Sequence, residues 1–565
     1  MQLEGYTDLT RINRGGMAAI YRGRQTSLDR TVAIKYLSAE YLWDDQAKAL
    51  FEQESRVIAQ LNHPNIIHVI DRGFSSKGRP YFVMEFVEGE DLESRMQRRK
   101  ISAVDKVEMM IQVCKGLAFA HKNGIVHRDI KPANLLVDQE GHVRILDFGI
   151  AWLSAQGKPA SDTILGTPDY MSPEQLNRPD AVGPLSDVFA LGAVMYHLFT
   201  GATQTSRYPD WETALGKLPP TLADVVGECL AVEPGDRPAS IDAVQIRLLR
   251  FLNGAHIGAT QKREARSDIG SVSGKFRLLD ITARNRFGAL YLFEDKKRQR
   301  LWAIKKRNKS LAGFASAKSL KSIEHPNIVP IQGVSRGNGT FIVVMPHFAG
   351  GNLRDRLSRP CSALQFVEFA LPVCSALACA HQHQLVHGNL HPENILFDES
   401  GHVSIGDFGF DRRLSNPQAR DYQIDNNSSA SVAGDIYAAG AIFHHCLTAK
   451  PVFRLNGRLR MPATFLELDD ELAELICTML EPAQQHELGG FAGIESRLRD
   501  IGERLEKEDD ANSGQTNAKR SLATIVGLSI AAVFVGGYGL LSTGAVDPDR
   551  LVQLIGAWFG RSEAN

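Results

Sequence analysis

An internal repeat constrains this chain more than any other feature. The stretch Ala120 to Gly149, AHKNGIVHRDIKPANLLVDQEGHVRILDFG, returns at Ala380 to Gly409 as AHQHQLVHGNLHPENILFDESGHVSIGDFG, in register and with about half of the positions identical. Self-similarity of this kind indicates that one structural unit is used twice. The copies differ at polar positions, since His-Arg-Asp at 127–129 becomes His-Gly-Asn at 387–389. We therefore expect two units of one fold, the second without several polar groups of the first.

Length, charge and cysteine content limit the number of domains, the class of partner and the cellular compartment that we expect. At 565 residues the chain is too long for a single hydrophobic core. Its net charge is -1 and its pI about 7.0, so the overall charge gives no reason to expect a nucleic-acid partner. The seven cysteines are scattered and form no CxxC pair, which favours buried thiols in a reducing compartment over disulfides or zinc.

Short motifs follow one another through the first copy. In chain order they are the loop NRGGMAAI at 13–20, Lys35 in the strand TVAIKY, Glu54 in a helical stretch, HRD at 127–129, Asn134, DFG at 147–149 and SPE at 172–174. Each motif alone is weak evidence, and the loop keeps only one of the expected glycines. In this order and spacing they resemble the protein Ser/Thr kinases of the eukaryotic-like class found in bacteria. Lys131, two residues after Asp129, is the form typical of Ser/Thr kinases within that family.

The resemblance implies an α+β fold with two tandem bilobal protein-kinase-like domains, followed by a single transmembrane helix. The expected boundaries are 8–252 for the kinase domain, 253–272 for a polar linker without apolar periodicity, 273–505 for a degenerate second domain (a pseudokinase), 506–520 for a juxtamembrane stretch, 521–542 for the transmembrane helix and 543–565 for a short extracytoplasmic tail.

The resemblance also assigns roles, because phosphoryl transfer needs positioning and charge neutralisation more than covalent chemistry. Lys35, held by Glu54, would orient the triphosphate. Asp129 would accept the proton of the substrate hydroxyl, and Lys131 would offset charge on the transferred group. Asn134 and Asp147 would hold Mg²⁺. The residues expected to bind ATP are Asn13, Gly15, Gly16, Ile20, Ala33, Lys35, Glu85, Val87, Asp91, Asn134, Leu136 and Asp147.

The segment between Gly149 and Glu174 carries the candidate phosphorylation sites. Arg128, next to Asp129, supplies a cation that a phosphate on this segment could neutralise. Thr163 is the first candidate. Thr167 is the second, because the family uses an unmodified threonine at that position.

Two structural pairings follow from the same resemblance. Glu174 should pair with Arg237 of EPGDRP and tie the substrate platform to the C-terminal lobe. Asp187 of SDVFALG should brace the backbone of the HRD stretch.

The second copy keeps the order of the motifs and lacks several of the residues expected to act in catalysis. From Lys305 of WAIK to His325 the chain is eight residues shorter than from Lys35 to His63, and no acidic residue occurs before Glu324. The replaced positions are Asn389 for Asp129, His391 for Lys131 and Gln485 for Arg237. An amide is a far weaker base than a carboxylate, so we expect no phosphotransfer here. The retained Lys305, Asn394 and Asp407 leave nucleotide or metal binding open.

A charge-free stretch near the C-terminus predicts a membrane span. Leu522 to Leu541 is about long enough to cross a hydrocarbon core of ~30 Å, and a buried core helix is the alternative. Lys519 and Arg520 before it favour a single-pass inner-membrane protein with both kinase-like domains in the cytoplasm. Small residues at 523, 527 and 531 allow close helix packing and with it a homodimer.

The predicted function is transfer of the γ-phosphate of ATP, with Mg²⁺, to Ser or Thr hydroxyls of protein substrates. Autophosphorylation in the activation segment would activate the enzyme, and the second domain would be regulatory or serve in docking. The alternative is a catalytically inactive, membrane-anchored scaffold that binds nucleotide and signalling partners, supported only by the loop substitutions Asn13 and Ala18. A small-molecule kinase is disfavoured by the full activation segment and Glu174.

Overall fold

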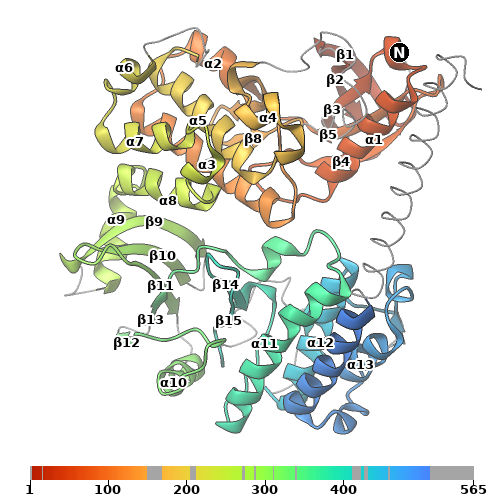
Figure 1. Cartoon of the computed structure of the whole chain (residues 1–565), viewed down its shortest axis with the longest axis vertical. Helices are drawn as coiled ribbons and strands as arrows, with labels where there is room; N and C mark the ends of the chain where they lie inside the picture. The colour runs from red at the N-terminus through yellow and green to blue at the C-terminus, as the bar shows by residue number, and fades with distance from the viewer. Residues whose placement is uncertain are drawn as a thin grey trace, which may run out of the picture.

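The structure, a computed structural model, contains two similar units, one drawn in red to yellow and one in green to blue (Figure 1). It describes residues 3–14, 17–148, 168–203, 211–269, 274–285, 288–308, 311–337, 340–409, 421–424, 430–455 and 458–508. Each unit begins with a five-stranded antiparallel sheet and continues into a mainly helical part. The expected α+β class is therefore confirmed. We call residues 3–252 the first unit and residues 274–508 the second unit.

The sheet of the first unit has the strand order β1-β2-β3-β5-β4. Its elements are β1 (Tyr6–Arg14), β2 (Ala18–Gln25), β3 (Arg30–Leu37), η1 (Ala39–Tyr41), α1 (Asp45–Ala59), β4 (Val69–Phe74) and β5 (Pro80–Glu85). Helix α1 packs on one face of the sheet, with the ring of Phe51 5.2 Å from that of Phe82. Its first turn is closed by Asp44, which accepts a hydrogen bond from the N–H of Ala47.

The helical part of the first unit is built around α3 and α5, most of whose side chains are buried. Its elements are β6 (Gly89–Asp91), α2 (Leu92–Arg98), α3 (Ala103–Lys122), η2 (Pro132–Asn134), β7 (Leu135–Asp138), β8 (Val143–Ile145), η4 (Pro168–Tyr170), α4 (Pro173–Asn177), η5 (Pro179–Ala181), α5 (Pro184–Thr200), α6 (Trp211–Leu215), α7 (Pro220–Cys229), η6 (Pro234–Asp236) and α8 (Ile241–Leu252). The HRD stretch at 127–129 follows shortly after α3.

The second unit repeats this plan, with the sheet order β12-β13-β11-β10-β9. Its elements are β9 (Phe276–Asn285), β10 (Gly288–Asp295), β11 (Leu301–Asn308), α10 (Leu311–Leu320), β12 (Gly333–Gly337), β13 (Thr340–Pro346), η8 (Leu353–Arg356), α11 (Ala363–Gln382), η9 (Pro392–Asn394), β14 (Ile395–Phe397), β15 (Val403–Ile405), α12 (Val432–Thr448), β16 (Phe453–Leu455), β17 (Arg458–Arg460), η12 (Ala463–Phe465), α13 (Asp470–Leu480), η13 (Gln485–Leu488) and a last helix over 490–508.

Within the described residues, α11 is the helix whose length and apolar composition would suffice to cross a membrane. Its side chains Phe366, Val373 and Leu377 are fully buried in the core of the second unit, so packing accounts for its apolar character. The membrane span predicted at 521–542 lies outside the described residues.

The expected polar linker is more ordered than its composition suggests. It contains the helix α9 (Ala259–Ile269), which packs on the outer face of the second sheet. Ile257 and Ala265 are the buried contacts on the linker side. Two apolar residues are too few to produce a periodicity, which explains why the sequence pattern did not reveal the helix.

The two units share one hydrophobic core where they meet. Leu279 of β9 and Leu292 of β10 are buried in the core of the first unit, beside α3 and α8. Figure 1 shows α8 lying against β9 at this boundary. The apolar surface of α3 and α8 is therefore covered by the second unit and not by solvent.

Buried carboxylates on the second sheet add ion pairs to this boundary. Glu294 has no solvent exposure and accepts a 2.7 Å hydrogen bond from Arg250 of α8 as well as one from Arg277. Asp280 contacts Lys115 of α3 at 3.6 Å and His256 at 3.3 Å. Since a buried carboxylate is costly without a cationic partner, these pairs specify how the units fit together.

Candidate active site

A lysine between two carboxylates marks the centre of the first unit. Lys35 of β3 places its Nζ 2.8 Å from Glu54 of α1 and 2.7 Å from Asp147 of the DFG stretch. The expected pairing of Lys35 with Glu54 is thus present. The contact joins the sheet, the helix α1 and the loop after β8 at one point.

The charge balance keeps Lys35 protonated. Burial alone would lower the pKa of the Lys35 ammonium, but the carboxylates of Asp147 and Glu54 outweigh burial and raise this pKa above its ordinary value. In the same way burial would raise the pKa of Asp147, and the attraction of Lys35 lowers it instead. The pair is therefore ionised at neutral pH, as a site for a polyphosphate requires.

The HRD loop places two predicted residues, Lys131 and Asn134, around the carboxylate of Asp129. Lys131 Nζ lies 2.8 Å from Asp129 Oδ2, and Asn134 donates from Nδ2 to the same oxygen at 2.9 Å. Asn134 also donates to the carbonyl of Asp129 at 2.8 Å, which fixes the turn of η2. Asp129 is thereby held with a cation and an amide directly beside it.

Asp187 of α5 holds the backbone before this carboxylate, as expected. It accepts hydrogen bonds from the N–H groups of His127 and Arg128 at 2.7 and 2.8 Å and is fully buried. Arg128 has φ 68°, a left-handed conformation that is unfavourable for a residue with a side chain. The two hydrogen bonds that the buried carboxylate accepts offset that cost.

The ring of His127 links the catalytic loop to the DFG stretch. Its Nδ1 accepts from the N–H of Asp129, so Nε2 donates to the carbonyl of Leu146 at 2.8 Å. Burial lowers the pKa of His127, which keeps the ring neutral in this role. The ring also packs 4.5 Å from that of Phe148.

The other residues predicted to bind the nucleotide come from both parts of the first unit. Ala33 of β3 is buried, Ile20 of β2 and Leu136 of β7 are half-buried, and Asn13 of β1 is exposed. Glu85 ends β5 and Val87 follows it between the sheet and the helical part.

Asp91, predicted to bind ATP, has a structural role. It caps α2, accepting from the N–H and the hydroxyl of Ser94, both at 2.8 Å. Gly15, Gly16, Thr163 and Thr167 lie outside the described residues.

A buried ion pair ties the SPE stretch to the C-terminal helices. Arg237 donates from Nη1 and Nη2 to the two oxygens of Glu174 at 2.7 and 2.8 Å, and the Arg237 side chain has no solvent exposure. Ser186 donates to Glu174 as well. Burial would raise the pKa of Glu174, but these hydrogen bonds lower it to about 2.

The second unit keeps the backbone frame of the catalytic loop. Asp435 of α12 accepts from the N–H groups of His387 and Gly388 at 2.7 and 2.8 Å. Gly388 has φ 70°, matching Arg128, and a Cβ at this position would lie 2.7 Å from that of Ala430. Glycine adopts this conformation without strain, so the backbone is less strained at Gly388 than at Arg128.

The charges of the second unit are rearranged. Asp407 is contacted by both Lys305 and Arg307 of β11. Burial would raise the pKa of Asp407, and the two cations lower it to about 2. Lys305 lacks a carboxylate from α10, whose sequence LAGFASAKSL contains none. Burial lowers the pKa of His391 to about 3, so this ring is neutral and does not replace the charge of Lys131.

Two residues at the first site were not singled out from the sequence. His121 of α3 contacts Asp187 Oδ2 at 2.7 Å through Nε2, and Gln175 donates to the carbonyl of Arg128 at 2.7 Å. The repeat carried a signal for the first, because His381 occupies the same position and contacts Asp435 at 2.9 Å. No comparable signal marks Gln175, since the second copy retains no SPE-like stretch.

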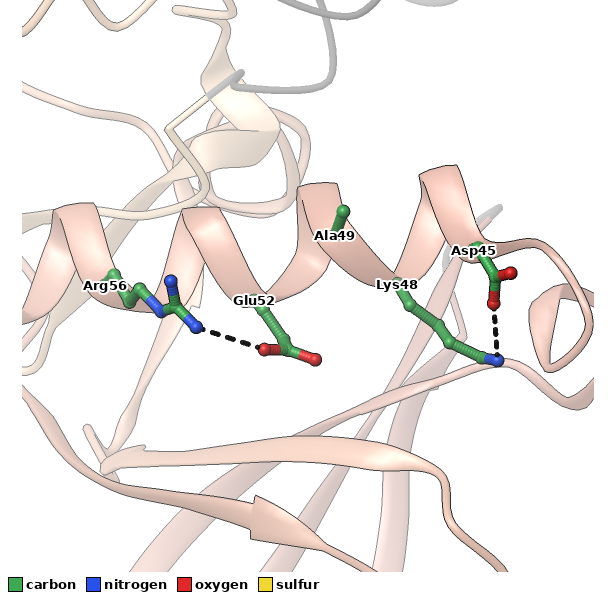
Figure 2. A pocket seen from close by; sticks show the side chains of 5 residues that line it. All are labelled: Asp45, Lys48, Ala49, Glu52 and Arg56. Atoms are coloured by element: carbon green, nitrogen blue, oxygen red, sulfur yellow. Dashed lines mark hydrogen bonds and ion pairs between the residues drawn. The ribbon is translucent and has the colours of Figure 1, made fainter.

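A shallow cavity lies on the outer face of α1, away from this site. Figure 2 shows its five lining residues, with ion pairs from Lys48 to Asp45 and from Arg56 to Glu52. Glu54 is on the opposite side of the helix, as the period of 3.6 residues requires. Exposed pairs of this kind contribute little to stability, and none of the five lining residues is one of the two carboxylates paired with Lys35.

Comparisons with known proteins identify both halves of the chain. The family model described as "Protein kinase domain" matches residues 6–248 and 284–487.

The chain is 35% identical over 268 residues to the serine/threonine-protein kinase pkn3 of Myxococcus xanthus, covering 42% of this chain and 48% of that protein. It is 34% identical over 255 residues to PknL of Mycobacterium tuberculosis, covering 42% and 63%. The chain thus spans about half to two thirds of the length of these relatives. The kinase domain of Mycobacterium tuberculosis PknI is similar over 44% of this chain and 97% of that chain, at 28% identity and a TM-score of 0.37.

The Glu174 pair yields a pH-dependent prediction. Because the pKa of Glu174 is about 2 in the folded protein and 4.5 ordinarily, its stabilising effect is complete above pH 4.5 and is lost as the pH falls toward 2. In the full chain, Glu174→Gln leaves Arg237 buried without a charge partner and should lower the free energy of unfolding by about 3–5 kcal/mol at pH 7. The loss should shrink as the pH is lowered from 5 to 3.

Urea denaturation at several pH values measures this effect. Glu228→Gln is the matched control, since Glu228 pairs with Arg247 on the surface, where such a pair contributes about 0–1 kcal/mol. Equal losses in the two variants, or a loss from Glu174→Gln that does not vary with pH, would contradict the prediction.

Proposed function

Since the chain belongs to the protein kinase family, we propose that its first unit transfers the γ-phosphate of ATP to Ser or Thr hydroxyls of protein substrates. The observation that carries the proposal is the contact of Lys35 with both Glu54 and Asp147. It places a permanent cation between two carboxylates, in the same unit as Asp129 and Lys131. The names of the related serine/threonine kinases support the choice of acceptor.

The residues at this site fit a magnesium ion. Asp147 and Asn134 supply a carboxylate and an amide, the hard oxygen ligands that Mg²⁺ prefers. Lys35 contacts Asp147 through Oδ1, and Asn134 uses its amide nitrogen, not its oxygen, to bond Asp129. When bound, the ion neutralises charge on the phosphates.

Each residue of the site then has a separate task. Lys35 binds and orients the triphosphate, and Glu54 keeps Lys35 directed toward it. Asp129 accepts the proton of the substrate hydroxyl, since its carboxylate is fixed by Lys131 and Asn134. Lys131 can also offset charge on the transferred group. Phosphorylation at Thr163 or Thr167 activates the enzyme in this proposal.

The second unit has no phosphotransfer activity in this proposal and serves a regulatory or docking role. It has an amide at Asn389 in place of the base and a neutral imidazole at His391. Asp407 is paired with two cations, both through Oδ2, so a metal ion is less favoured there than at Asp147, which is paired with Lys35. The proposal also includes a membrane anchor at Leu522 to Leu541, with both units on the cytoplasmic side.

The first prediction concerns the proton acceptor. In the full chain, Asp129→Asn should lower kcat for autophosphorylation by about 10²- to 10⁴-fold, because an amide cannot accept the proton. Nucleotide binding should persist, since Lys35 and Glu54 are unchanged. Asp138→Asn, a turn residue bonded to His142, is the matched control and should transfer phosphate normally. An unmodified chain that binds ATP and transfers no phosphate would favour the scaffold function.

The second prediction concerns the degenerate site. Asn389→Asp added to Asp129→Asn should leave the full chain at the residual activity of Asp129→Asn, because restoring one carboxylate supplies neither an acidic partner from α10 nor a cation at His391. Radiolabelled transfer to the chain itself and to generic protein substrates measures this. Activity above that of Asp129→Asn would show that the second unit needs only its base.

The third prediction concerns topology. Protease added to spheroplasts should spare residues 1–520, because ATP is cytoplasmic and the basic pair Lys519 and Arg520 opposes export. Immunoblots against each unit, before and after detergent lysis, give the comparison. Cleavage of either unit before lysis would overturn the proposed orientation.

A further inference from the structure

The C-terminal end of α3 contacts the second unit. Lys122, Asn123 and Gly124 end this helix and lead into the catalytic loop of the first unit. The opposing segment is Gly351–Arg359, which contains η8 and the residues after it. These two stretches are far apart in sequence and meet through specific polar contacts.

Asn123 carries the most specific of these contacts. Its side chain donates from Nδ2 to the carbonyl of Asp355 at 2.7 Å and accepts at Oδ1 from the N–H of Ser358 at 3.3 Å. It also donates to the carbonyl of Phe119 in its own helix at 2.8 Å. Asn123 is 3% exposed, so these hydrogen bonds replace water. A buried amide with three partners fixes the two segments relative to each other.

The neighbouring residues extend the contact. Lys122 pairs with Asp242 of α8 at 3.1 Å, and a Cβ on Gly351 would lie 3.1 Å from its Nζ. Arg359 approaches Gly124 so closely that a Cβ on this glycine would collide with the guanidinium. The end of α3 therefore touches the second unit on three successive residues.

No equivalent of this arrangement is found among the described residues of the second unit. The residue that ends α11 in the position of Asn123 is His383, which is exposed and contacts only the carbonyl and thiol of Cys379 in its own helix among the described residues. Asn123 and His383 thus share a side-chain hydrogen bond to the carbonyl four residues earlier, that of Phe119 in the first unit and of Cys379 in the second. The bonds of Asn123 to Asp355 and Ser358 are additional and are specific to the boundary between units.

The end of α3 is close in the chain to the reactive groups. Ile125 donates to the carbonyl of Ala120 at 3.0 Å and is buried, and His127 follows two residues later. In the last turn of the same helix, His121 contacts Asp187, the residue that holds the backbone of His127. A shift of this helix end is therefore transmitted to Asp129 by two short paths.

We propose that the segment Gly351–Arg359 of the second unit positions the catalytic loop of the first unit, with Asn123 as the positioning residue through which it acts. The second unit is then a fixed part of the first active site, and it needs no catalysis of its own for this role. The kinetic part of the test rests on the proposed phosphotransfer, whereas the structural part does not.

The test compares three variants of the full chain. Asn123→Ala removes the bonds across the boundary, and Arg359→Ala removes a contact from the second unit alone, leaving the bond of Asn123 to Phe119 in place. Arg250→Gln is the matched control, because it weakens the same boundary at Glu294, far from the helix end, while Arg277 still pairs with Glu294.

Two readouts are needed. Hydrogen exchange should become faster in peptides covering 125–134 for Asn123→Ala and for Arg359→Ala, and should equal the unmodified chain for Arg250→Gln. In kinetics, Asn123→Ala should lower kcat about tenfold with KM for ATP unchanged, since Lys35 and Glu54 are not touched. This separates loss of positioning from general loss of stability.

The outcomes decide between the alternatives. Unchanged exchange at 125–134 in both test variants, or an equal increase in Arg250→Gln, would overturn the inference. If Asn123→Ala does not fold, Arg359→Ala decides by the same exchange measurement. A chain that transfers no phosphate in its unmodified form refutes the proposed function, while the exchange data still test the positioning role.

Discussion

A buried carboxylate that accepts two backbone N–H groups holds the catalytic loop in both units. Asp187 does so for His127 and Arg128, and Asp435 does so for His387 and Gly388. A carboxylate without solvent exposure is stable only with such partners, so the loop and α5 or α12 must form together. This explains why the loop keeps its shape at 387–389, where its reactive side chains have changed.

The charge around one lysine distinguishes the two units more clearly than their shapes do. Lys35 has two carboxylates beside it, and they raise its pKa despite burial. Lys305 has one carboxylate and a neighbouring guanidinium, Arg307, and its pKa is lowered by burial and by that cation. The first arrangement suits a polyphosphate with its metal ion. In the second, Asp407 is paired with two cations from the chain itself, Lys305 and Arg307.

The sequence predicted contacts that belong to motifs. Lys35 with Glu54, Glu174 with Arg237 and Asp187 with the HRD backbone could be foreseen, because each depends on a spacing that defines the repeat unit. The contact of Arg307 with Asp407 could not be foreseen, since it arises only where the shortened α10 supplies no acidic side chain. The shared core was also hidden, because Leu279 and Leu292 look like ordinary strand residues until the second sheet is placed on α3 and α8.

The shared core also has a consequence during synthesis on the ribosome. Chains of this size fold unit by unit from the N-terminus. Helix α8 of the first unit ends at Leu252, whereas Leu279 and Leu292, which complete its core, leave the ribosome later. Until then the apolar surface of α3 and α8 is open to chaperones and proteases. Any product truncated between these points keeps that surface exposed, so quality control should remove it.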